Sequence, residues 1–202
     1  MARQCMTLTD SICRGCKDNA GGIKKVYLTN EIMINWEAIE TNEDGSISNI
    51  EFVTGQYIDP AEASWHVYQV NKYSSSWTET INVADTGNVS YQQVASLVFS
   101  QNDQDKRNAI EQVSSGEVAM IIVDNNNTMW LIGEEDNCAG LSGGNSTSGT
   151  ALSDMNGWTL EFTCNAARPA VTIAKDATAG EVEGTPITLQ SLLDEADSEC
   201  RG

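Results

Sequence analysis

Short segments in which hydrophobic and polar residues alternate dominate the chain. The clearest are residues 77–83 and 158–164, where an apolar side chain stands mostly at every second position and Thr, Glu or Asn fills the gaps. A period of two is typical of half-buried strands. Similar patterns predict further strands at residues 23–28, 31–38, 47–53, 65–70, 89–99, 118–123, 128–132 and 170–174.

One internal segment has a different period. Residues 102–113 place Ala109, Ile110 and Val113 at helical spacing, with acidic residues at the start and Ser-Ser-Gly after the end. This arrangement predicts a helix. Because the predicted strands are many, short and separated by Gly- and Asn-rich turns, we expect a mainly β fold. The expected architecture is an antiparallel β-sandwich or barrel with one flanking α-helix and terminal arms.

Three stretches differ from the rest in composition. Residues 139–150 are rich in Gly and Ser, which predicts a flexible loop. After Lys175 the chain becomes acidic, and Ile187, Leu189, Leu192 and Leu193 suggest a short amphipathic helix. We therefore divide the chain into an N-terminal arm (1–22), a β domain (23–174) and an acidic C-terminal arm (175–202). The last arm is either a frayed tail or a segment that becomes ordered on a neighbouring subunit.

Composition limits the classes of partner. The 202 residues include 11 Lys plus Arg and 29 Asp plus Glu, a formal net charge of −18, and 40% are hydrophobic. Such a chain is too apolar to be disordered and too acidic to bind nucleic acid or anionic lipid tightly. The first residues lack the apolar stretch of a signal peptide, and the longest apolar run, 118–123, is too short to span a membrane. We therefore expect a folded protein made in the cytoplasm.

The cysteines do not form a recognisable metal site. Cys13 and Cys16 make one Cys-x-x-Cys motif, but a second pair at similar spacing, which structural zinc sites usually have, is missing. No βαβ pattern follows the motif, which disfavours a redox role. We expect no metal or other cofactor, and zinc chelation should leave stability unchanged. Cys164, on an apolar strand face, is expected to be a small buried hydrophobe.

Candidate catalytic and binding groups are equally sparse. His66 is the only histidine, and no nucleophile or base accompanies it in sequence, so we expect no enzyme activity. Asp44 and Asp124 lie in acidic turns that lack the spacing of a calcium loop. The tryptophans of the predicted strands are expected to fill the core, with a carbohydrate-binding face of exposed aromatic residues as the alternative.

The order of motifs nevertheless resembles a known family. Residues 16–27 read CKDNAGGIKKVY, and later come a strand ending in Leu97-Val98-Phe99, a polar helix and a hairpin around Asp124-Asn125-Asn126. A Gly/Ser loop and the run SDMNGWTLEFT at 153–163 follow. Over residues 16–173 this succession is similar to the tail tube (major tail) proteins of tailed bacteriophages. The Cys-rich start and the acidic end differ from that family.

The resemblance implies a virion structural protein. Tail tube subunits assemble as hexameric rings that stack into a hollow tube, bind other tail proteins, and let genomic DNA pass without specific binding. The implied location is the virion tail, after assembly in the host cytoplasm. Candidate ring-bridging parts are residues 42–60, the 139–150 loop and both termini.

Two general features of the sequence agree with this expectation. An acidic wall repels phosphate, and free strand edges can pair between subunits. The alternatives are a tail terminator or neck protein that forms a single ring, a carbohydrate-binding or adhesion module, and a hydrolase that uses carboxylates.

Overall fold

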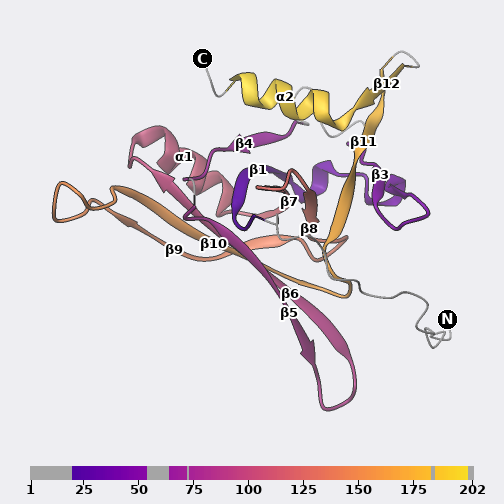
Figure 1. Ribbon diagram of the computed structural model, residues 1–202, viewed down its shortest axis with the longest axis horizontal. Helices are drawn as coiled ribbons and strands as arrows, with labels where there is room; N and C mark the ends of the chain where they lie inside the picture. The colour runs from indigo at the N-terminus through magenta and orange to yellow at the C-terminus, as the bar shows by residue number, and fades with distance from the viewer. Residues whose placement is uncertain (1–19, 54–63, 72, 183–184, 200–202) are drawn as a thin grey trace.

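A computed structural model describes residues 20–53, 64–71, 73–182 and 185–199. The described chain is mainly β, with two α-helices (Figure 1). Its strands are β1 (Ile23–Asn30), β2 (Glu40–Thr41), β3 (Ile47–Asn49), β4 (His66–Tyr68), β5 (Ser76–Val83), β6 (Val89–Ser100), β7 (Glu117–Asp124), β8 (Met129–Ile132), β9 (Ala139–Thr147), β10 (Gly157–Ala166), β11 (Val171–Val182) and β12 (Thr185–Thr188). The helices are α1 (Gln104–Val113) and α2 (Leu189–Glu199).

The strands form one 12-stranded mixed sheet. Its main path runs β2-β3-β11-β8-β7-β9-β10-β6-β5, while β1 pairs with β7 and β4, and β12 pairs with β11. Every pairing of these strands is antiparallel except that of β3 with β11. The expected mainly β fold is therefore confirmed. Its sheet contains one parallel pair of strands, whereas a wholly antiparallel arrangement was expected.

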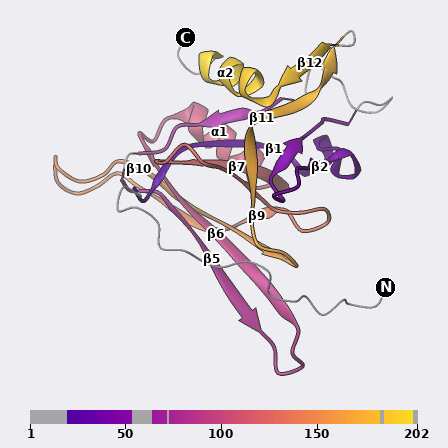
Figure 2. The same ribbon diagram turned by 45° about the vertical axis from the view of Figure 1, so that its right-hand side comes forward.

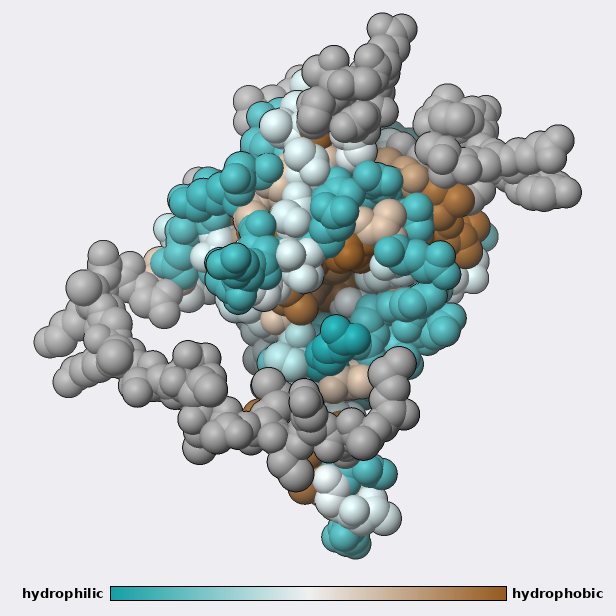
Figure 3. Space-filling model, turned by 90° about the vertical axis from the view of Figure 1, so that its right-hand side faces the viewer, coloured by the Kyte–Doolittle hydropathy of each residue, from teal (hydrophilic) through white to brown (hydrophobic). Residues whose placement is uncertain are grey.

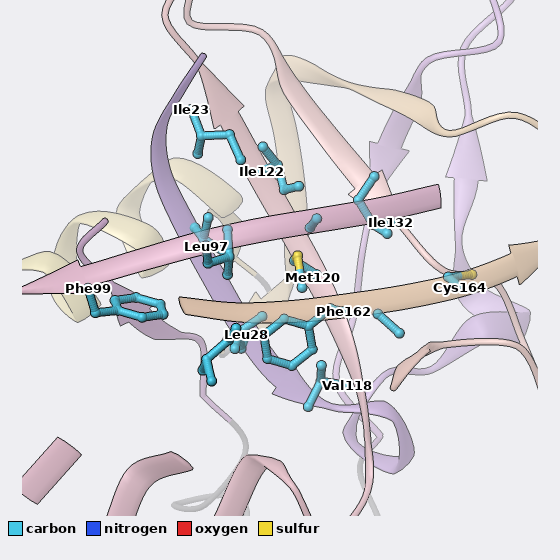
Figure 4. Packing of buried hydrophobic residues seen from close by; sticks show 14 of the residues in the cluster. Ile23, Leu28, Leu97, Phe99, Val118, Met120, Ile122, Ile132, Phe162 and Cys164 are labelled. Carbon is cyan, nitrogen blue, oxygen red and sulfur yellow. The ribbon is translucent and has the colours of Figure 1, made fainter. Parts of the chain in front are cut away.

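The main hydrophobic cluster joins two parts of this sheet. Leu97 of β6 and Phe162 of β10 lie in the same cluster as Leu28 of β1 and Met120 of β7, and all four are at most 2% exposed. Figure 4 shows side chains from these strands packed together. Burial of apolar side chains is the main driving force for folding, and it contributes about 25 cal/mol per Å² of apolar surface. The long β6–β10 pair is thus fixed to the body of the molecule along one face.

A second cluster holds the C-terminal region. Leu189, Leu193 and Ala196 of α2 pack with buried residues that include Tyr27 and Ile47. Lys25 of β1 and Asp197 of α2 form an ion pair, which compensates for the burial of the Asp197 side chain. The predicted amphipathic helix therefore exists, starting at Leu189 after Thr188, whose Oγ1 accepts a hydrogen bond from the Ser191 N–H. In the structure α2 packs on its own chain, whereas the sequence suggested a frayed tail or a segment that becomes ordered on a neighbouring subunit.

Two other local expectations are wrong. Residues 31–38 form two 3-10 helices, Glu31–Met33 and Trp36–Ala38, in place of a strand. Residues 139–150 were expected to be a flexible loop, but Ala139–Thr147 is strand β9, paired with β10 along most of its length. The strand expected at 170–174 extends to Val182, so the chain continues through residue 175 without a break.

The helix expected at 102–113 is confirmed as α1. The side chain of Asp103 caps it by accepting the N–H of Lys106 at 2.9 Å. Hydrogen bonds from Lys106 lower the pKa of Asp103 below its usual value. Ile110 and Val113 pack against the main hydrophobic cluster, so the helix flanks the sheet as expected.

Candidate assembly surfaces

Four strands project a sheet beyond the body of the molecule. Strands β9, β10, β6 and β5 are consecutive in the sheet order, and the β5–β6 hairpin extends away from α2 (Figures 1 and 2). The β6–β10 pair runs without interruption from Ser100 opposite Gly157 to Tyr91 opposite Ala166. We call β9, β10, β6 and β5 the four-stranded sheet.

Both outer edges of the four-stranded sheet are open. Within the described residues, β5 pairs only with β6. On the opposite side, β7 pairs with β9 only at Ala139 and Gly140, so residues 141–147 have β10 as their sole strand neighbour in the described chain. Unpaired N–H and C=O groups along such edges are templates for another strand.

The two faces of the four-stranded sheet differ in chemistry. One face carries Leu97, Phe99, Leu160 and Phe162 into the main cluster. The register assigns the alternate positions to the opposite side, which we call the outer face. The residues of the outer face include Ser76, Thr78, Thr80, Asn82, Ser90, Gln92, Val94, Ser96, Val98, Gly143, Asn145, Thr159, Glu161, Thr163 and Asn165.

Charge is almost absent from this surface. The four strands contain no Lys and no Arg, and their only carboxylates are Glu79 and Glu161. Glu79 is on the core-side face, opposite Gln93, which leaves the exposed Glu161 as the single charge of the outer face. Most of the net charge of −18 therefore comes from other parts of the chain.

A buried polar network holds the root of the β5–β6 hairpin. Gln93 is 2% exposed; its Nε2 donates to Glu79 Oε2 and to the carbonyl of Arg168, and its Oε1 accepts the N–H of Gly133. Glu79 Oε2 also accepts the N–H of Ala170 at 2.7 Å. These hydrogen bonds join the β5–β6 hairpin to the chain at Gly133, Arg168 and Ala170.

The hairpin has an apolar end. Ile81 is 61% exposed, Val83 68% and Val89 41%, and all three lie on the same side of the hairpin. The turn beyond them is closed by the Ala84 N–H donating to the carbonyl of Asn88, and Gly87 adopts a φ of 81°. A glycine suits that left-handed conformation, which other residues rarely adopt. We call Ile81, Val83 and Val89 the hairpin tip.

The described part of the body is indented by grooves, and two of them bear on assembly. One, of about 870 Å³, is lined by residues that include Trp36, Ile47, Glu134 and Arg168. On the side that Figure 3 shows, hydrophilic residues surround a hollow with hydrophobic residues at its floor. The other groove, of about 790 Å³, lies between α1 and β4 and includes Tyr68, Phe99 and Ala109 in its lining. We call this second one the α1–β4 groove.

The candidate catalytic and metal-binding residues named from the sequence do not come together in one site among the described residues. His66 is exposed on β4, where its Nε2 is 3.4 Å from Ser64 Oγ. Among the described residues, no three His, Cys, Asp or Glu side chains come close enough together to hold a metal ion. Asp44 and Asp124 accept hydrogen bonds from N–H groups of their own turns. Cys13 and Cys16 lie outside the described residues.

The described cysteines are buried, and the tryptophans are buried or half-buried. Cys164 is 1% exposed, as predicted, and burial raises its pKa to about 11. Burial also raises the pKa of Cys138, so both thiols stay protonated at neutral pH. Trp65 is 3% exposed, and the rings of Trp77 and Trp130 lie 5.3 Å apart. These packed rings do not form the exposed aromatic face that carbohydrate binding would need.

The candidate ring-bridging segments have mixed outcomes. Residues 42–53 form a turn, β3 and the following segment, whereas 54–60 and residues 1–19 lie outside the described chain. Residues 139–147 are an edge strand, so they contribute to the four-stranded sheet. The sequence did not predict this sheet, because the Gly- and Ser-rich segment of β9 was expected to be a loop. The lack of Lys and Arg in all four segments was the available signal that they form one surface.

No protein-family model, curated protein or solved structure matches the chain. No described helix is long and apolar enough to cross a membrane. Function must therefore be inferred from the surfaces of the chain itself.

Proposed function

We propose that this protein is a tail tube subunit of a tailed bacteriophage. Copies associate side by side into hexameric rings, and the rings stack into a hollow tube in the virion tail after assembly in the host cytoplasm. The observation that carries the proposal is the four-stranded sheet with an open edge on each side. The ring number of six and the phage context come from the family resemblance.

The two edges are different surfaces that can pair with each other between copies. The edge of β5 on one copy can pair with the edge of β9 on the next copy, and this contact uses two different surfaces. Such heterologous contacts close into rings when the rotation between copies allows it. Pairing around the ring would also cover both open edges of the four-stranded sheet, and covered edges cannot template uncontrolled aggregation.

Closure of the ring would create a wide barrel whose wall is made of the four-stranded sheet of each copy. Barrels of about 16–18 strands already enclose an aqueous channel, so four strands from each of six copies would surround a wider one. The core-side face of the sheet already packs on the body, so the outer face would line the channel.

The chemistry of the outer face suits a passing polyanion. Nucleic-acid binding needs Lys and Arg to displace counterions, and the four strands have neither. Hydroxyl and amide side chains remain hydrated, and the Glu161 carboxylates repel phosphate. DNA would therefore move along the wall without being held. The wall is less acidic than the composition suggested, because it carries one carboxylate per copy.

A lysine placed on the edge strand β5 tests the proposed contact between β5 of one copy and β9 of the next. We expect the purified wild-type chain to form rings and hollow tubes in negative-stain electron microscopy. Thr78→Lys places a charge on exposed β5 and should leave monomers by analytical ultracentrifugation, because edge lysines disfavour strand addition.

Thr159→Lys is the matched control. It adds the same charge to the same face, but on the inner strand β10, and should still form rings. Isolated rings that never stack would favour the terminator or neck protein. A wild-type chain that stays monomeric at every concentration contradicts the proposed function.

A further inference from the structure

The hairpin tip is an apolar surface at one end of the molecule. The β5–β6 hairpin projects beyond the body (Figure 1), and its residues Ile81, Val83 and Val89 are 41–68% exposed. Scattered apolar residues are common on protein surfaces, but three neighbours on one side of a projecting hairpin mark a contact site. The Gln93 network joins their two strands to each other and to Gly133 of the body.

The α1–β4 groove lies at the opposite end of the same strands. Phe99 and Ser100, the last residues of β6, line the groove, whereas Val89, the first residue of β6, belongs to the tip. Twelve residues of extended chain span roughly 40 Å, so tip and groove cannot meet within one chain. The groove also offers apolar surface from Tyr68, Val70 and Ile110.

We propose that the hairpin tip of one copy inserts into the α1–β4 groove of a second copy in the next ring. This inference rests on the proposed function and names the contact that joins successive rings. A projection and a groove at opposite ends of one chain form a heterologous contact that repeats along an axis. The open edges of β5 and β9 remain free for contacts within each ring.

Charge does not oppose this contact. The groove lining carries one carboxylate, Asp105, and one ammonium group, Lys106, which forms an ion pair with Asp103. The turn beyond the tip carries a single carboxylate, Asp85. The stabilisation of the contact comes from apolar side chains leaving water on both surfaces, at about 25 cal/mol per Å². A second copy is therefore an occupant that matches the groove in chemistry and in position.

Paired aspartate variants test the tip. Ile81→Asp charges the tip, and we expect it to form single rings that do not stack, as seen by negative-stain electron microscopy. Asn82→Asp adds the same charge to the same hairpin on its outer face, and should stack as the wild type does. Because both positions are exposed, thermal unfolding should show the same stability for the two variants.

Variants of α1 test the groove. Ala109→Asp changes a residue of the groove lining and should also give single rings, whereas Asn108→Asp, exposed and outside the lining, should not. Rings of Ile81→Asp keep intact grooves, and rings of Ala109→Asp keep intact tips. Mixing the two preparations should therefore give stacks of two rings and no longer tubes.

The outcomes separate the inference from the proposed function. Tubes of normal length from Ile81→Asp, or no double rings in the mixture, overturn the tip-to-groove contact while leaving the proposed function intact. A wild-type chain that remains monomeric overturns both.

Discussion

Tyr27 shows at the scale of one residue how the C-terminal helix affects stability. This residue of β1 is 1% exposed, and it lies in the same buried cluster as α2. Burial, together with the nearby carboxylate of Asp194, raises the pKa of its phenol from 10.0 to about 12. Between these values the unfolded chain has released the proton and the folded chain retains it. Stability must then fall as the pH rises, because unfolding releases a proton.

This pKa shift predicts an alkaline loss of stability. We expect the free energy of unfolding of the wild type to fall between pH 10 and 12, by at most about 2.7 kcal/mol for two pKa units. Tyr27→Phe removes this contribution, whereas Tyr73→Phe, at an exposed position, should retain the wild-type slope. Urea unfolding at pH 8–11.5 measures the effect. An equal slope for the wild type and Tyr27→Phe would contradict it.

At the scale of elements, local pattern predicted most strands and failed where tertiary contacts decide. At residues 31–38 alternation suggested a strand, yet Met33 and Ile34 are both buried as neighbours and Ile32 is 68% exposed. Hydrogen bonds to the next segment, such as Asn35 N–H to the carbonyl of Glu51, hold this 3-10 conformation. The pattern of hydrophobic and polar residues within 31–38 contains no information about those distant partners.

Strand β9 was missed for a different reason. Its Gly and Ser residues have low strand propensity, which favours a loop. In the structure the glycines permit close approach to β10: a Cβ at Gly144 would lie 2.7 Å from the carbonyl oxygen of Thr159. Pairing with a neighbouring strand therefore decides this element, and composition alone could not reveal it.

Two adjacent glycines of β9 give a matched test. Gly144→Ala should destabilise the chain by about 1–3 kcal/mol, since a small-to-large change in a packed position shifts its surroundings. Gly143→Ala should cost less than about 1 kcal/mol, because a Cβ there meets nothing within 4 Å. Urea denaturation of both variants measures the difference. Similar losses for the two variants would contradict the close packing of β9 on β10.

At the scale of the whole molecule, composition predicted acidity but not its distribution. The chain carries a net charge of −18, yet the outer face of the four-stranded sheet holds only Glu161. The position of this face depends on the register of β5, β6, β9 and β10. Since β9 was expected to be a loop, sequence alone could not assemble the sheet or identify Glu161 as its one charge.

Reversing that single charge should convert the wall into one that binds DNA. In Glu161→Lys, each copy would add one ammonium group to the channel, and a ring would align several of them against phosphates. We expect assembled Glu161→Lys to bind short duplex DNA at low salt, with affinity falling steeply as salt rises, because released counterions drive such binding. Fluorescence anisotropy of labelled DNA, titrated with assembled protein at several salt concentrations, measures this change.

The controls separate position from net charge. Glu161→Gln removes the carboxylate without adding a cation, and should bind DNA as weakly as the wild type. Glu111→Lys makes the same charge reversal on the exposed surface of α1, away from the outer face. If the outer face lines the channel, only Glu161→Lys protects bound DNA from nuclease, because duplex inside a closed wall is shielded on all sides. Equal binding and equal nuclease sensitivity for Glu161→Lys and Glu111→Lys would show that the outer face does not line a channel.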